Sequence, residues 1–109
     1  MKQRLGSSMI SFRDKVIAPS HVLVRFMDNE SVLLNMETER YFGLDETGTR
    51  MWQLSTGESS IELAYQQLLS EYDIDADTLR QNLGELLEKL TENGLLTIIP
   101  SNVGADSTI

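Results

Sequence analysis

Three aspartates at alternate positions form the arrangement in this sequence that most resembles a metal site. Asp73, Asp75 and Asp77 repeat at the spacing of the first ligands of a calcium-binding loop. Counted from Asp73, however, Thr78 and Gly84 stand where such a loop needs its glycine and its last glutamate. Capping of a helix explains the aspartates better, and we expect no metal site here.

Side chains that serve catalysis are scarce. The chain has no cysteine, which excludes a disulfide, a thiolate nucleophile and a zinc-thiolate site. His21 is the one histidine, at the opening of a strand, where we expect neither a base nor a ligand. The seven glycines form no phosphate loop. Most carboxylates lie in turns, at helix starts or on an outer helix face, as solvated surface does. The sequence therefore predicts no enzyme and no cofactor.

Length and charge narrow the classes further. With 109 residues and 40% hydrophobic composition, the chain can bury one modest core. No apolar run approaches the roughly 20 residues that cross a bilayer, and no signal peptide is recognisable, so we expect a cytoplasmic protein without membrane association. From residue 26 onward four basic residues face sixteen acidic ones, while the basic residues concentrate before that point. Such a body repels phosphate backbones and suits a basic or neutral partner, so we expect no nucleic-acid ligand.

The first half of the chain has the pattern of a β-meander. Residues 21–28 and 31–38 are rich in branched and aromatic side chains and flank a turn at residues 28–30, which predicts a hairpin. Residues 40–44 follow a tight connection and predict a third strand. On the second strand, Val32, Leu34 and Met36 share one face because side chains alternate.

The second half has helical spacing. Asp45 is placed to cap a helix that ends near residues 56–57 and buries Trp52 in the core. Ser59 opens a second helix, and a third follows an Asp75 cap, carries an apolar stripe of Leu79, Leu83, Leu86 and Leu90, and stops at Gly94. Residues 96–99 predict a short edge strand.

The expected fold is α+β and winged-helix-like: a three-stranded antiparallel meander, three helices and a possible C-terminal edge strand. We expect a flexible N-terminal arm at residues 1–19 whose second half docks on the body. The body spans residues 20–99, and a disordered tail spans residues 100–109.

A winged-helix-like body makes a small DNA-binding transcriptional regulator the principal rival function. The third helix would then read the major groove. Between residues 75 and 92, five acidic residues outnumber two basic ones, which is the wrong sign for phosphate contact. A gel shift at low salt separates this rival from a peptide-binding module.

Two features favour a binding module. If the third strand lies at the sheet edge, its unpaired amides and carbonyls offer a template for another extended chain. Gly84 stands inside a predicted helix, where glycine costs about 1 kcal/mol against alanine. A close approach of another backbone would explain it, and a tolerated surface glycine explains it equally well.

Three runs then resemble the PqqD-like family of peptide chaperones, or precursor-peptide recognition elements, over roughly residues 20–97. They are VLLNMETERYFGLDETGTRMWQL, LLSEYDIDADTL and LLEKLTENGLL. The resemblance implies that the leader segment of a ribosomally made precursor adds as a strand beside the third strand, with its apolar side chains against the third helix. It implies peptide-binding residues on the strand (Arg40, Tyr41, Phe42, Gly43 and Leu44) and on the helix (Ala76, Arg80, Leu83, Gly84 and Leu87).

On this interpretation Phe42 and Leu44 turn into the core, whereas Tyr41 and Gly43 face the groove. We also expect Leu87→Glu to weaken leader binding while leaving the fold largely intact. The implied partners are the precursor leader and a separate leader peptidase or radical-type tailoring enzyme, as in lasso-peptide pathways. We expect a monomer or weak dimer. A domain that only docks two enzymes is a third, weaker alternative.

Overall fold

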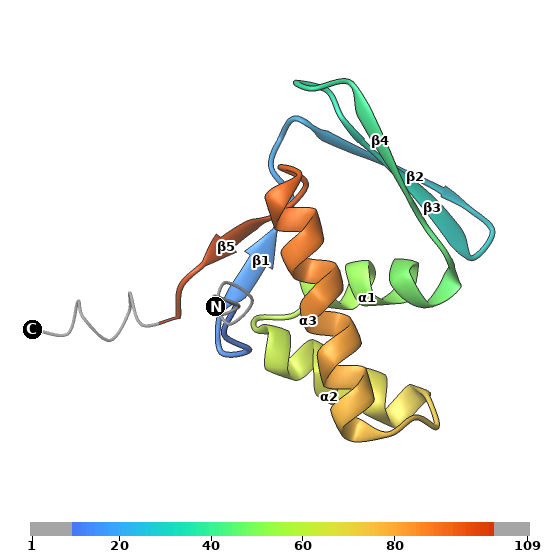
Figure 1. The fold of residues 1–109 in the computed structure, drawn as a ribbon, viewed down its shortest axis with the longest axis vertical. Coiled ribbons are helices and arrows are strands. Elements are labelled where there is room, and N and C mark those ends of the chain that lie inside the picture. Colours follow the sequence, from blue (N-terminus) through green and yellow to red (C-terminus); the bar gives the residue numbers. More distant parts are fainter. Residues whose placement is uncertain (1–9, 102–109) are drawn as a thin grey trace, which may run out of the picture.

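The computed structural model describes residues 10–101, which fold into two small sheets and three helices (Figure 1). The elements, in chain order, are β1 (Lys15–Ile17), β2 (Val22–Met27), β3 (Glu30–Asn35), β4 (Arg40–Leu44), α1 (Glu46–Gly57), α2 (Ile61–Glu71), α3 (Ala76–Glu92) and β5 (Thr97–Ile99). The predicted α+β fold, with a three-stranded antiparallel meander followed by three helices, is confirmed. Residues 1–9 of the expected arm and residues 102–109 of the expected tail lie outside the described residues.

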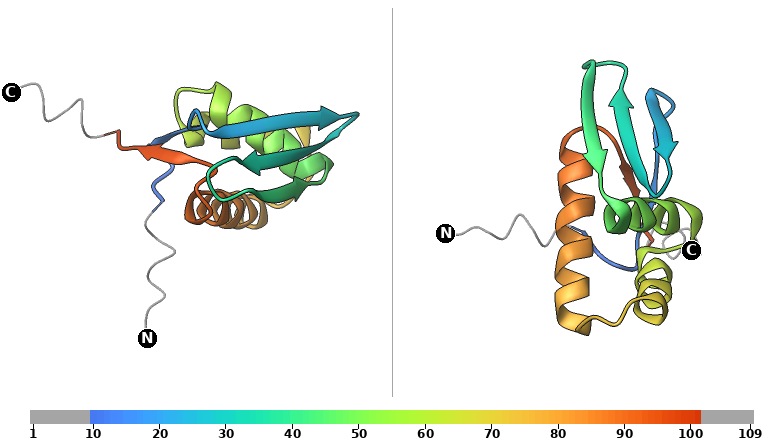
Figure 2. Two further views of the ribbon diagram at one scale, coloured as in Figure 1. Left: turned by 90° about the horizontal axis from the view of Figure 1, so that it is seen from above. Right: turned by 90° about the vertical axis from the view of Figure 1, so that its right-hand side faces the viewer.

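The meander has the strand order β2-β3-β4, so β4 lies at one edge. Its two turns contain Asp28 and Glu39, which adopt left-handed φ values of 58° and 62°. α1 lies below the lower end of this sheet, α3 lies on the side of β4, and α2 lies beyond α1, away from the strands (Figure 2). The covered face of β3 carries Ser31, Leu33 and Asn35, which are buried. The more apolar face of the same strand is the uncovered one. The buried Ser31 hydroxyl has a hydrogen-bond partner, because its oxygen lies 2.8 Å from the Thr49 hydroxyl oxygen.

Each helix begins at a capping side chain. The Asp45 carboxylate accepts the Gly48 N–H at 2.8 Å, and the Asp75 carboxylate accepts the Thr78 N–H at 3.0 Å, as predicted. The predicted cap at Ser59 is wrong by one residue, because Ser60 accepts the N–H at the start of α2. Within residues 10–101, no helix is long and apolar enough to span a membrane.

The core lies among α1, α2 and α3, and the meander adds Leu33 and Leu44 to it. Met51 and Trp52 of α1 are buried there, in agreement with the expected core position of Trp52. The buried stripe of α3 consists of Leu79, Leu83, Leu87 and Leu90. This stripe differs from the predicted one at a single position: Leu87 takes the place of Leu86.

Residues 10–17 pack on the body, and residues 15–17 form a strand that the sequence pattern does not indicate. β1 pairs antiparallel with β5, from Lys15 opposite Ile99 to Ile17 opposite Thr97. Val16 is fully buried, and the Lys15 ammonium donates to two carbonyl oxygens at the end of α1. The pairing gives the predicted C-terminal edge strand a partner from the opposite end of the chain.

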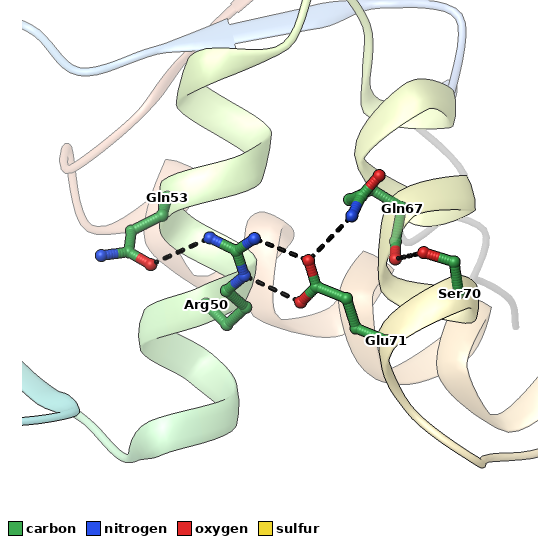
Figure 3. Close-up of polar contacts among 5 residues, drawn as sticks. All are labelled: Arg50, Gln53, Gln67, Ser70 and Glu71. Atoms are coloured by element: carbon green, nitrogen blue, oxygen red, sulfur yellow. Dashed lines mark hydrogen bonds and ion pairs between the residues drawn. The ribbon is translucent and has the colours of Figure 1, made fainter.

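An ion pair joins α1 to α2. Arg50 donates from Nε and Nη2 to the two carboxylate oxygens of Glu71, at 2.8 and 2.6 Å, and Gln67 donates to the same carboxylate at 2.9 Å (Figure 3). The Arg50 hydrogen bonds, followed by that from Gln67, lower the pKa of Glu71 from its usual 4.5 to about 2. A bidentate pair of this kind restrains the orientation of the two helices.

The pH dependence of stability should report this pair. Because the pKa of Glu71 is lower in the folded chain, its contribution is complete above about pH 4.5 and is lost as the pH falls toward 2. We expect Arg50→Gln to reduce the free energy of unfolding at pH 6 by up to about 1 kcal/mol, since the pair is partly exposed. The difference from the unmodified protein should shrink between pH 4.5 and 2 in urea unfolding. Arg25→Gln, on the outer sheet face, is the charge-matched control, and an Arg50→Gln difference that stays constant with pH would contradict the assignment.

Candidate functional site

The outer backbone edge of β4 has no strand beside it among residues 10–101. Met36 donates its N–H to the His21 carbonyl oxygen at 2.9 Å, so even-numbered amides of β3 face β2 and odd-numbered ones face β4. By the same alternation, the even-numbered residues of β4 pair with β3. The N–H and C=O groups of Tyr41 and Gly43 therefore point away from the sheet. This edge offers two donors and two acceptors in strand geometry.

A groove of about 720 Å³ runs between this edge and α3. We call it the β4–α3 groove; its lining residues are Phe42, Gly43, Leu44, Asp45, Gly48, Asn82, Glu85, Leu86 and Lys89. Phe42 and Leu86 are half-buried and form apolar walls on the two sides. A side chain added at Gly43 would meet nothing within 4 Å, so the strand is open at this position.

Hydrogen bonds close the end of the sheet next to the C-terminus of α3. Asn35, which is 3% exposed, donates to the Asn93 carbonyl oxygen at 3.0 Å, and its own side-chain oxygen accepts two N–H groups of the β3–β4 turn. The His21 ring lies 3.0 Å from the Gly94 carbonyl oxygen, so this side chain has a structural contact. Gly94 has a φ of 72°, and a Cβ there would lie 2.8 Å from the Asn35 amide nitrogen. Glycine thus permits both the helix stop and the close approach of the sheet.

The predicted strand residues separate into three groups. Phe42, Gly43 and Leu44 line the groove. Tyr41 does not, contrary to expectation: its side chain is 72% exposed on the outer sheet face, beside Leu34 and Met36. Arg40 lies at the polar end of the sheet near His21 and Asn93. Phe42 is half-buried: it packs against the core, as expected, and it also lines the groove.

The predicted helix residues do not line the groove. Arg80 lies over the rings of Phe12 and Tyr65, at 4.2 and 4.6 Å from their centroids, and pairs with Glu62 at 2.9 Å. A Cβ at Gly84 would lie 3.8 Å from the same Phe12 ring. These residues therefore lie on the flank of α3 that faces the N-terminal segment.

The other three helix residues have structural contacts. Ala76 opens α3 and accepts the Tyr65 hydroxyl at its carbonyl oxygen, at 3.0 Å. Leu83 and Leu87 are fully buried. The expectation that Leu87→Glu leaves the fold intact is therefore wrong, because the substitution would place a carboxylate in the core.

The groove-facing helix residues that sequence reasoning missed are Asn82, Glu85, Leu86 and Lys89. Their spacing of three and four is that of one helix face, so the sequence contains a signal for them. Among the described residues, no group of three or more His, Asp or Glu side chains is placed to hold a metal ion.

Comparison with known proteins identifies relatives of this arrangement. The family model described as coenzyme PQQ synthesis protein D (PqqD) matches residues 30–96. A curated relative, the PqqA binding protein of Bradyrhizobium diazoefficiens, is 24% identical over 88 residues, which cover 81% of this chain and 85% of that protein.

Two solved structures share the fold. TbiB1, in complex with the TbiA(beta) leader peptide, is 32% identical and superposes with a TM-score of 0.69 over 73% of this chain and 93% of its own. A lasso peptide synthetase B1, complexed with the leader peptide, is 24% identical, with a TM-score of 0.69 over 76% of this chain and 98% of its own.

Proposed function

The chain belongs to the PqqD family, and from this premise we propose that it binds the leader segment of a ribosomally made precursor peptide. One observation carries the proposal: the edge of β4, which no strand covers among residues 10–101, lies beside the β4–α3 groove with its apolar walls of Phe42 and Leu86. An edge strand supplies register through backbone hydrogen bonds, and an adjacent groove supplies selection through side-chain pockets. The relative TbiB1, which was solved with a leader peptide, supports this assignment.

In the proposed complex, the leader adds as a strand to the outer edge of β4. Its backbone exchanges hydrogen bonds with the N–H and C=O groups of Tyr41 and Gly43. Alternate side chains of the leader then face the groove and pack between Phe42 and Leu86. The proposed helix contacts are thus Asn82, Glu85, Leu86 and Lys89, in place of the residues that the family resemblance implied.

The proposed role is noncatalytic. The leader, once held as a strand, is presented to a separate leader peptidase or tailoring enzyme. The curated relative is named for binding a peptide, which fits a carrier role. Rigid presentation reduces the conformational freedom that an enzyme must otherwise remove from a flexible substrate.

Hydrogen exchange of the β4 amides tests the proposal directly. The probe is a synthetic peptide with the leader sequence of the precursor encoded beside this gene. Because their N–H groups face outward, the amides of Tyr41 and Gly43 should exchange at least about tenfold more slowly in the saturated complex. The amides of Phe42 and Leu44 already bond to β3 and serve as internal controls with a much smaller change.

Calorimetry of the same titration establishes whether the peptide binds at all. Absence of binding would refute the proposed function. Binding without added protection at Tyr41 and Gly43 would refute addition at β4 while leaving peptide binding itself in place.

A further inference from the structure

The β4–α3 groove carries opposite charges at its two ends. Asp45 and Glu85 line the end next to Leu44, where β4 passes into α1. At the other end, the Lys89 ammonium lies 6.0 Å from the centroid of the Phe42 ring. Glu85 and Lys89 lie one helical turn apart on the same face of α3, and Lys89 is the one nearer the C-terminal end of the helix.

None of Asp45, Glu85 and Lys89 takes part in an ion pair within the described part of the chain. Asp45 accepts a backbone N–H as the cap of α1, and Glu85 accepts a hydrogen bond from the neutral Gln81 amide at 3.1 Å. All three side chains are exposed, so a ligand in the groove would reach them.

The surroundings of the basic end also contain Arg40 and Glu92. Both line the polar pocket at the C-terminus of α3, beyond Lys89. Neither of them lines the β4–α3 groove, so Lys89 is the cation of the groove itself. Between the two ends the walls are apolar, formed by Phe42 and Leu86.

We infer that this groove selects leader strands of a particular charge pattern: a basic side chain at the Leu44 end, apolar side chains over Phe42 and Leu86, and an acidic side chain beside Lys89. The inference rests on the proposed leader binding and adds its chemical selectivity. Complementary charges fix the register of the strand and exclude strands with the reversed order, which would place like charges together at both ends.

Charge reversal in the protein tests the inference. We expect Lys89→Glu and Glu85→Lys each to raise the Kd of the leader about three- to tenfold at low ionic strength, because an attraction becomes a repulsion. The increase should diminish at 0.5 M salt. Arg13→Glu, on the N-terminal segment away from the groove, changes the net charge as Lys89→Glu does and should leave the Kd within about twofold.

Compensating changes in the leader identify the contacting side chains. Leader variants in which one acidic residue at a time is replaced by lysine should include one that binds Lys89→Glu at least about threefold more tightly than the original leader does. The same variant should bind the unmodified protein more weakly.

Two outcomes would overturn the inference. In the first, Lys89→Glu and Glu85→Lys match Arg13→Glu in Kd while the leader still binds, so the groove has no charge selectivity although the proposed function stands. In the second, the leader does not bind the unmodified protein, and the proposed function falls together with its selectivity.

Discussion

Replacing Gly43 with proline should raise the Kd of the leader at least about tenfold, because it removes one of the two outward N–H donors of β4 and places a ring on the pairing edge. The outward direction of this N–H means that the hydrogen bonds between β3 and β4 are kept. The expected result is therefore a protein that folds and fails to bind. Calorimetry with the leader peptide measures the Kd, and thermal unfolding confirms the fold.

Gly43→Ala is the matched control. It retains the N–H group, and its methyl group meets no atom within 4 Å. We expect its Kd to remain within about threefold of that of the unmodified protein. If alanine weakened binding as much as proline, side-chain space at this position would matter and the backbone donor would not. Unchanged binding by Gly43→Pro would remove β4 pairing from the mechanism.

Adjacent leucines of α3 should respond to truncation in opposite ways. Leu87 is fully buried in the core, so Leu87→Ala should lower the free energy of unfolding by about 2 to 5 kcal/mol. Leu86 is half-buried in the groove, so Leu86→Ala should cost about 1 kcal/mol or less of stability and raise the Kd of the leader several-fold. Urea unfolding and calorimetry on both variants give the comparison.

The pair of variants contains its own control, because each has the same change of side chain on the same helix. If Leu86→Ala destabilised the fold as strongly as Leu87→Ala and left the Kd unchanged, Leu86 would be a core residue and the groove would need a different wall.

The order of elements was predictable because local signals agree with the packing. Branched residues on both sides of the turn at residues 28–30 specify the hairpin, and Asp45 and Asp75 occupy the caps that their side chains satisfy. β1 was not predictable in the same way. Three residues carry too little periodicity to indicate a strand, and Val16 becomes buried only because β5 arrives from the far end of the chain.

The sequence indicated three strand residues of the candidate groove, Phe42, Gly43 and Leu44, and none of its helix residues. Position in the meander determines that β4 is an edge, whereas leucines at residues 79, 83, 86, 87 and 90 allow two neighbouring stripes on one helix. The choice between them depends on what packs against each flank. Here the N-terminal segment places Phe12 against the flank with Arg80 and Gly84, which leaves the flank with Leu86 beside β4.

The β1–β5 pairing has a consequence for synthesis of the chain. Lys15 and Ile99 are register partners, so this ribbon cannot form on the ribosome until residue 99 has left the exit tunnel. The meander and its β4 edge need only contacts that are local in sequence and can form much earlier. A nascent chain would thus expose the unpaired edge of β4 before the β1–β5 ribbon has formed. Pairing of that edge with another incompletely synthesised chain would lead to aggregation during translation.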